Sequence, residues 1–268
     1  MKNLEILVAT MKQKDMSLVE KMNLRCDAVI ANQADEYGYQ SVTTEYGTVK
    51  MISTDTIGVG RNRNMALALA DSEIVLFADD DITYYDDGAE GVIRAFDELK
   101  DADVIAFSLD ISKNGNIVQK RRWKIQKRHL WNVFKYGTCV LAARRSSLAK
   151  NGIAFNTVFG GGCVYGSGED STFLRECLRK GLKIYSHSHV LGVSSKDGSS
   201  WFQGFNEKYF HDKGAWIACA FPCMKHLIKW YYVWRLRKKT ELKVREIVKQ
   251  LNHGIRNYKT LTPYQEGK

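Results

Sequence analysis

Three adjacent aspartates, Asp79, Asp80 and Asp81, directly follow the apolar run from Glu73 to Ala78. Such a concentration of negative charge is unfavourable unless a cation offsets it. Alternate residues of an extended segment point to the same side, so Asp79 and Asp81 are predicted to converge on one ion while Asp80 points elsewhere. Magnesium and manganese prefer oxygen ligands and keep open positions for substrate phosphates. The pattern therefore predicts a Mg²⁺ or Mn²⁺ site, with a solvated acidic turn as the simpler alternative.

A second pair of carboxylates, Glu169 and Asp170, follows the glycine-rich stretch 159–168 and opens a predicted helix over 169–180. Glycines permit tight turns and the close approach of a ligand. The positive end of a helix dipole favours ionised carboxylates. A carboxylate in this position can take a proton from an attacking hydroxyl group. The alternative is that both acids only stabilise the first turn of the helix.

The segments around these acids alternate between strand and helix patterns, judged by apolar periodicity and helix propensity. Strands are predicted at 4–9, 27–31, 48–53, 73–78, 104–109, 137–142 and 182–186, and helices at 62–71, 87–100, 169–180 and from about 225 onward. Asn114-Gly115 predicts a tight hairpin turn. Strands alternating with helices are typical of an α/β fold with a mostly parallel sheet. Ligands of such sheets bind beyond the carboxyl ends of the strands, where the acidic triplet lies.

The stretch from Gly58 to Ile82, GVGRNRNMALALADSEIVLFADDDI, resembles the core of family 2 glycosyltransferases. In that family a glycine-containing loop leads into Arg-Asn, an Ala-rich helix, an apolar strand and a DxD motif. The segment that begins at Glu169-Asp170 resembles the family's catalytic Glu-Asp helix. The resemblance covers roughly residues 3–215. It implies a GT-A fold with a Rossmann-like, mostly parallel sheet flanked by helices, a nucleoside-diphosphate sugar donor and inversion at the anomeric carbon.

The resemblance also implies roles for individual residues. Asp170 would be the catalytic base, and Glu169 would orient the acceptor or act as an alternative base. Asp81 would be the firmest metal ligand, while Asp79 would lie near the metal and the donor ribose. The residues expected to bind the donor are Thr10, Asn32, Arg63, Asn64, Asp79 and Asp80.

Two places depart from the family pattern. Many relatives have an acidic residue followed by Asp-Gly-Ser after the second strand, where this chain reads Ala31-Asn32-Gln33-Ala34-Asp35, so the identity of the nucleotide stays open. Relatives tend to carry a histidine shortly before Ser-Ser-Trp, where this chain has Val193 to Lys196. The third metal ligand is therefore absent, replaced by Lys196 or supplied by His189. A structural role is the alternative for His189.

Basic residues concentrate in two segments of a chain whose net charge is +10. Residues 113–150 hold eleven Lys/Arg and no acid, and residues 225–268 hold twelve Lys/Arg and three acids. Within the first segment, residues 120–131 (KRRWKIQKRHLW) interleave cations with aromatic residues, which suits the diphosphate of a lipid-linked acceptor or a solvated face, and no nucleic-acid motif accompanies them. In the second, Trp and Tyr among Lys and Arg are typical of a helix on an anionic membrane surface. A core cap or a dimer contact is the alternative, so the oligomeric state stays open.

The sequence also carries negative signals. It has no apolar stretch typical of a signal peptide and none of membrane-spanning length. Its six cysteines lack the spacing of metal ligands. We therefore expect a cytoplasmic protein, with membrane association at the inner face as an option. Its expected domains are a GT-A catalytic domain over 1–215 and a helical, basic and aromatic tail over 216–268.

These features predict a metal-assisted, inverting glycosyltransferase that moves a sugar from a nucleoside-diphosphate sugar to a glycan or lipid-linked acceptor. One alternative is a nucleotidyltransferase, although residues 9–15 lack the glycine-rich loop expected for a triphosphate. The other is a non-enzymatic module that uses the basic segments to bind a membrane or nucleic acid.

Overall fold

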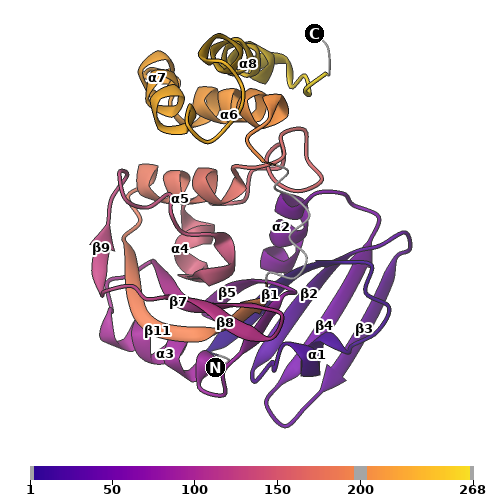
Figure 1. Cartoon of the computed structure of the whole chain (residues 1–268). Helices are drawn as coiled ribbons and strands as arrows, with labels where there is room; N and C mark the ends of the chain where they lie inside the picture. Colours follow the sequence, from indigo (N-terminus) through magenta and orange to yellow (C-terminus); the bar gives the residue numbers. More distant parts are fainter. Residues whose placement is uncertain (1–2, 196–203, 266–268) are drawn as a thin grey trace.

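The computed structural model describes residues 3–195 and 204–265. These residues form an eleven-stranded sheet with helices on both faces, and three C-terminal helices lie above it (Figure 1). The strands are β1 (Leu4–Met11), β2 (Asp27–Gln33), β3 (Gly38–Thr43), β4 (Thr48–Thr54), β5 (Ile74–Asp79), β6 (Ile82–Tyr84), β7 (Val104–Lys113), β8 (Asn116–Arg121), β9 (Gln126–Arg128), β10 (Leu141–Arg144) and β11 (Ile184–Ser195). The helices are α1 (Leu18–Lys21), α2 (Val59–Leu69), α3 (Gly88–Glu98), α4 (Arg145–Lys150), α5 (Glu169–Arg179), α6 (Glu207–Ala220), α7 (Lys225–Leu236) and α8 (Val244–Asn257), with 3-10 turns η1 (Thr138–Val140) and η2 (Tyr258–Thr260).

Parallel strands β4, β2, β1 and β5 form one half of the sheet. Strands β1, β2 and β5 are almost wholly buried, which accounts for their continuous apolar sequences. The register pairs Ala9 with Asp79 and Thr10 with Asn32, so these strands end at one edge. The fold therefore delivers the acidic triplet to a common edge of the sheet, as predicted.

The sheet as a whole is mixed, which corrects the prediction of a mostly parallel sheet. Strand β10 runs antiparallel between β5 and β7, and β3, β6, β8 and β9 also pair in antiparallel fashion. Strands β7 and β8 are joined by the predicted turn at Asn114-Gly115, where both φ angles are positive. Antiparallel strands can be joined without a helical crossover. The alternation of strands and helices in the sequence therefore does not reveal whether two neighbouring strands are parallel or antiparallel.

Most predicted elements are confirmed with shifts of a few residues at their ends. The strand predicted at 137–142 begins only at Leu141, after the 3-10 turn η1. Thr138 in that turn donates its hydroxyl to Asp170, which draws the chain towards α5 and out of an extended conformation. The last predicted strand is longer than expected, since β11 continues to Ser195 and pairs with β6. Helical structure also begins before residue 225, at α6.

An aromatic cluster ties the end of β5 to α5. Phe77 packs edge-on against Phe155 and Phe173, with ring centroids 5.0 and 5.6 Å away, and Phe155 stacks on Phe173 at 4.3 Å. Each such pair contributes about 0.5–1.5 kcal/mol beyond its burial. Phe77 precedes Asp79 by two residues and Phe173 follows Asp170 by three. The cluster therefore fixes the distance between the two acidic segments.

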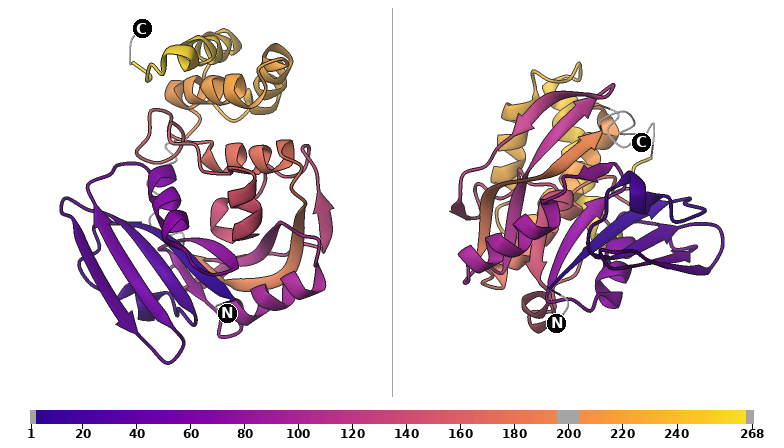
Figure 2. Two further views of the ribbon diagram at one scale, coloured as in Figure 1. Left: turned by 180° about the vertical axis from the view of Figure 1, so that it is seen from behind. Right: turned by 90° about the horizontal axis from the view of Figure 1, so that it is seen from below.

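The C-terminal helices have a hydrophobic core of their own, which includes Phe210, Trp216 and Leu251. They lie above α5 and away from the sheet, as the view from behind also shows (Figure 2). The predicted domain boundary after residue 215 falls inside α6, which runs continuously from Glu207 to Ala220. None of the helices in the described part of the chain combines the length and apolarity needed to cross a bilayer.

Helices α6 and α8 approach closely at Gly214 and Gly254. A Cβ atom at Gly214 would lie 2.2 Å from the carbonyl oxygen of Leu251, and one at Gly254 would lie 1.8 Å from that of His211. Both neighbours are backbone atoms, which cannot turn away as a side chain can. The two glycines therefore set the separation of these helices.

We predict that Gly254→Ala destabilises the protein by about 1–3 kcal/mol, because the extra methyl group overpacks the contact between the helices. In a helix without such a contact, replacing glycine by alanine would raise stability by up to about 1 kcal/mol. A loss of stability therefore indicates the steric contact between the helices. Urea unfolding measures the effect. The matched control is Gly38→Ala, whose Cβ would meet only the Cβ of Ser53 at 3.8 Å. Equal stability of both variants would contradict the close packing.

Candidate active site

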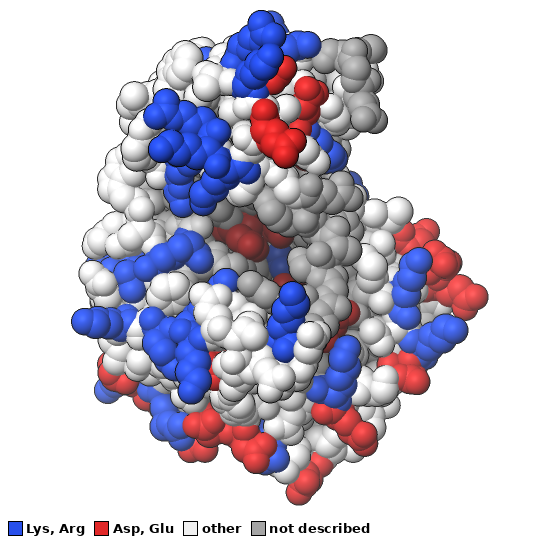
Figure 3. Space-filling view, viewed as in Figure 1, with Lys and Arg blue, Asp and Glu red and all other residues white. Residues whose placement is uncertain are grey.

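A cleft of about 850 Å³ lies between the carboxyl edge of the sheet and the C-terminal helices. Its wall is built from the ends of β1 and β5, from α2, from the glycine-rich loop that leads into α5, and from α6. Figure 3 shows the hollow, with acidic side chains at its depth. Both acidic segments singled out from the sequence, Asp79 to Asp81 and Glu169-Asp170, line this cleft.

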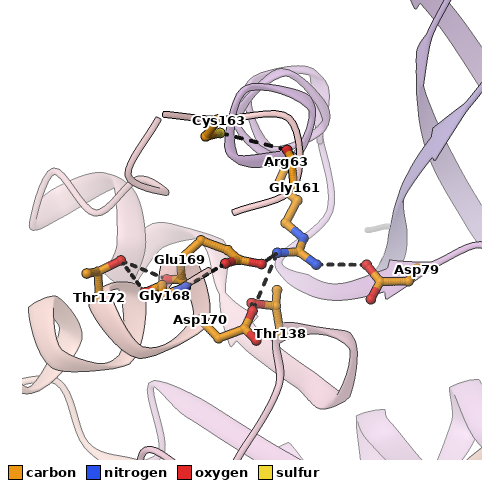
Figure 4. Close-up of polar contacts among 9 residues, drawn as sticks. All are labelled: Arg63, Asp79, Thr138, Gly161, Cys163, Gly168, Glu169, Asp170 and Thr172. Carbon is orange, nitrogen blue, oxygen red and sulfur yellow. Dashed lines mark hydrogen bonds and ion pairs between the residues drawn. The ribbon is translucent and has the colours of Figure 1, made fainter. Parts of the chain in front are cut away.

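Arg63 of α2 links the two acidic segments at the floor of the cleft (Figure 4). Its Nη2 donates to Oδ1 of Asp79 at 2.7 Å, and its Nη1 lies 3.4 Å from Oε1 of Glu169 and 3.5 Å from Oδ1 of Asp170. The side chain is only 4% exposed. Burial opposes its charge, but the charges of Asp79, Asp170 and Glu169 outweigh this cost and raise its pKa. Arg63 therefore stays charged and holds three carboxylates around one cation.

A glycine places the second acidic pair. Gly168 has a φ angle of +123°, and a Cβ atom there would lie 2.5 Å from the Trp216 ring. Its N–H donates to Oε2 of Glu169 at 3.1 Å. Only glycine adopts this conformation against a packed ring without strain. The residue before α5 therefore turns the chain so that Glu169 and Asp170 enter the cleft together.

Glu169 and Asp170 lie in different environments although they are adjacent. The Glu169 side chain is 14% exposed, and that of Asp170 is 35% exposed. Burial and the neighbouring Asp170 charge raise the pKa of Glu169 to about 7, against the opposing effect of Arg63. Asp170 also accepts a hydrogen bond from the Thr138 hydroxyl. The pair thus offers one deeply placed carboxyl group that titrates near neutrality and one more accessible carboxylate.

The acidic triplet does not continue as an extended strand. Strand β5 ends at Asp79 and the chain turns before β6, so Asp80 lines the cleft together with Asp79 and Asp81. Asp80 accepts a hydrogen bond from the Thr10 hydroxyl, and Asp81 accepts one from Oγ of Ser194 at 3.0 Å. Burial and the charge of Asp79 raise the pKa of Asp81. A nearby cation would relieve that repulsion.

The composition of the cleft fits a hard divalent cation. Five carboxylates line it against three cations, those of Lys21, Arg63 and Lys213. Within the described residues no cluster of three or more His, Cys, Asp or Glu side chains is suited to hold a metal. Magnesium is commonly held by one or two carboxylates together with substrate phosphates. Asp79 and Asp81 provide ligands of that kind.

Two predicted donor-binding residues support the cleft without lining it. The Asn32 amide accepts from the N–H of Gln13 at 3.0 Å and donates to the carbonyl of Gln13 at 2.9 Å and to the Ser53 hydroxyl at 2.8 Å. The Asn64 amide makes two such bonds with the backbone of Phe155, at 2.9 and 2.7 Å. Both amides are therefore engaged in fixing loops.

Two further polar residues line the cleft. Gln33 at the end of β2 does so, and its Oε1 accepts from the N–H of Gly58 at 3.1 Å. Asn62 of α2 bonds the carbonyls of Thr10 and Ala31 at 3.0 and 3.3 Å. Gln33 directly follows Asn32 on β2, and Asn62 precedes Asn64 by two positions on α2, so each faces the cleft from the same element as the residue expected there.

His189 does not join Asp79 and Asp81. Its ring packs on α3, where a Cβ atom at Gly91 would lie 2.0 Å from its Nε2. It lines a separate pocket together with Tyr85, Asp87 and His187. The structure therefore does not supply the expected third ligand from this histidine, because β11 is longer than predicted and carries it to another part of the sheet. Lys196, the other replacement considered, lies outside the described residues.

The comparisons with known proteins agree with this architecture. The model of "Glycosyl transferase family 2" matches residues 16–151, slightly more than half of the chain. The fold is GT-A-like, and the chain belongs to glycosyl transferase family 2. It is therefore a glycosyltransferase, which decides against the nucleotidyltransferase and the non-enzymatic module. No curated protein sequence matches the chain.

Crystal structures of S. aureus TarS show the same fold. The structure of TarS residues 1–349 with UDP-GlcNAc has a TM-score of 0.63 at 14% identity, over 98% of this chain and 93% of that one. The complex with UDP has a TM-score of 0.60 at 16% identity, over 97% of this chain and 90% of that one. A longer TarS structure matches over 49% of its length, with a TM-score of 0.59.

We predict that Glu169→Gln gains stability relative to the wild type as the pH rises. In the folded protein the Glu169 pKa is about 7, above its ordinary value of 4.5, so the wild type loses stability between these values while the amide does not. The difference between pH 5 and pH 8 should be about 1–3 kcal/mol. Urea unfolding at both pH values measures it. A stability difference that is independent of pH would contradict the raised pKa.

Proposed function

We propose that this family 2 glycosyltransferase moves a sugar from a UDP-sugar to a hydroxyl group of a glycan or lipid-linked acceptor, with inversion at the anomeric carbon and with Mg²⁺ or Mn²⁺. The observation that carries the proposal is the cleft in which Arg63 joins two sets of carboxylates. The UDP-GlcNAc and UDP complexes of TarS, which shares the fold, support a uridine nucleotide donor.

Each acidic segment has a distinct task in this proposal. Asp79 and Asp81 would hold the divalent cation, which when bound neutralises charge on the leaving diphosphate. Asp80, fixed by Thr10, adds to the negative field that attracts the cation. Thr10 itself lines the cleft beside this group, where it can contact the donor.

Asp170 would take the proton from the acceptor hydroxyl as it attacks the anomeric carbon. The Thr138 hydroxyl and Arg63 orient this carboxylate. Glu169, deeper in the cleft, would orient the acceptor or hold Arg63 in place. Inversion follows if the acceptor attacks on the side opposite the departing diphosphate.

The direct test of the proposal is release of UDP from UDP-GlcNAc in the presence of Mn²⁺. A panel that includes GDP- and dTDP-sugars identifies the nucleotide. Turnover of UDP-sugars that stops after chelation of the metal is expected. Turnover that persists after complete chelation would refute metal assistance, and turnover of only GDP- or dTDP-sugars would refute the uridine donor.

We predict that Asp81→Asn abolishes metal-dependent turnover while the fold stays intact, because the amide removes the charge that attracts the cation. Mn²⁺ binding followed by electron paramagnetic resonance should weaken in parallel. Asp97→Asn, which alters an exposed acid of α3 away from the cleft, serves as control. Full activity and unchanged Mn²⁺ binding in Asp81→Asn would refute the assignment.

We also predict that Asp170→Asn lowers the transfer rate by about 10²-fold or more, the usual contribution of a general base. The affinity for UDP should stay near that of the wild type. Transfer kinetics and UDP titration separate the two effects. Loss of UDP binding with a retained transfer rate would instead make Asp170 a donor-binding residue.

The tail supports a further part of the proposal, a cytoplasmic enzyme that binds an anionic membrane reversibly. Helix α7 exposes Leu227, Trp230, Tyr231 and Trp234 on one face, with exposures of 65, 53, 46 and 67%. Basic side chains gather over the C-terminal helices (Figure 3). All six cysteines are free thiols, as is usual in a reducing compartment. Such a face would bring the cleft close to a lipid-linked acceptor.

We predict that the protein binds anionic liposomes at low salt and is released at high salt, since each Lys or Arg near the surface contributes about 1 kcal/mol within a Debye length. Replacing both Trp230 and Trp234 by alanine should abolish cosedimentation without unfolding, because both rings are exposed. Tyr39→Ala, which removes an exposed ring on β3, is the control. Failure of the intact protein to bind would favour a dimer contact instead.

A further inference from the structure

Lys213 of α6 reaches into the cleft from the side of the C-terminal helices. Its Nζ lies 4.6 Å from the ring centroid of Trp216, 5.4 Å from that of Tyr232 and 5.6 Å from that of Tyr209. Tyr209 and Trp216 stand one turn before and one turn after Lys213 on the same helix, and Tyr232 comes from α7. Three aromatic rings from two helices thus surround the ammonium group.

The ammonium group has no anionic partner among the residues that the structure describes. The neighbouring carboxylate of Asp212 is engaged with Lys208, His211 and the N–H of Gly166. The oxygens of Glu169 face Arg63 and the N–H of Gly168. Burial, followed by the charge of Arg235, lowers the pKa of Lys213 to about 8. Lys213 is half-buried, and placing a cation there without an anion beside it costs free energy that the rings offset only in part.

The position of Lys213 distinguishes the two ends of the cleft. The Trp216 ring, 4.6 Å from Lys213 Nζ, packs against Gly168, where a Cβ atom would lie 2.5 Å from it, and Gly168 directly precedes Glu169 and Asp170. Lys213 therefore lies at the end where Glu169 and Asp170 would meet the acceptor.

We propose that Lys213 binds an anionic substituent of the acceptor, a phosphate or carboxylate group close to the hydroxyl that receives the sugar. This inference rests on the proposed function, in which the acceptor lies beside Asp170. A phosphate oxygen would supply the missing negative charge, and the rings would pack on the apolar part of the acceptor. The same cation could instead hold a phosphate of the donor, so the test must separate the two sources.

Limited acetylation at pH 8 followed by mass spectrometry measures the access to Lys213. Glycerol 1-phosphate serves as the anionic probe, glycerol as its neutral counterpart and UDP with Mn²⁺ as the donor probe. At ten times its dissociation constant, glycerol 1-phosphate should slow acetylation of Lys213 by about tenfold, while glycerol and UDP do not. The exposed Lys249 of α8 is the internal reference and should not respond.

Two variants complete the test. Calorimetry should show that Lys213→Met loses about tenfold in affinity for glycerol 1-phosphate, whereas Lys213→Arg retains it because the charge is kept. Protection of Lys213 by UDP would overturn the inference in favour of the donor diphosphate, and absence of protection by either anion would overturn it altogether. If the protein neither binds UDP nor releases it from UDP-GlcNAc, the proposed function fails, and the acetylation result still decides whether Lys213 binds an anion.

Discussion

The buried guanidinium of Arg63 is the interaction on which the site depends. Three carboxylates, those of Asp79, Glu169 and Asp170, contact it from two segments that are about ninety residues apart in the chain. Without the cation these carboxylates would repel one another in a poorly solvated place. With it, the same carboxylates leave enough excess negative charge to attract a metal. One buried cation thus allows the three acidic side chains to lie close together.

The rest of the fold serves this arrangement. The rings of Phe77, Phe155 and Phe173 support the acids from below, and the Arg63 guanidinium lies 5.5 Å from the Phe155 ring centroid. The Asn64 amide holds the backbone of Phe155, so this residue of the Arg-Asn motif acts on packing. The C-terminal helices close the cleft on the side away from the sheet. Lys213 of α6 adds a second cation on that side. Hydrophobic packing therefore sets the geometry in which the charges act.

The sequence predicted those parts of the site that lie in contiguous motifs. The acidic triplet and Glu169-Asp170 both line the cleft, because a strand end and a helix start determine where they point. Periodicity did not reveal the antiparallel strands, nor that Asn32 and His189 point away from the cleft. Lys213 could not be found in this way, since its position depends on how α6 packs on α5, a contact between distant segments.

The stability of Arg63→Met, measured by urea unfolding at pH 5 and pH 8, tests the central claim most directly. Removing one partner of a buried ionic group costs about 3–5 kcal/mol, and this cost should appear at pH 8, where the three carboxylates are left ionised without their cation. At pH 5 the loss should be clearly smaller, because Glu169 takes up a proton and the repulsion falls. Equal destabilisation at both pH values would show that Arg63 acts through packing alone and would contradict the account.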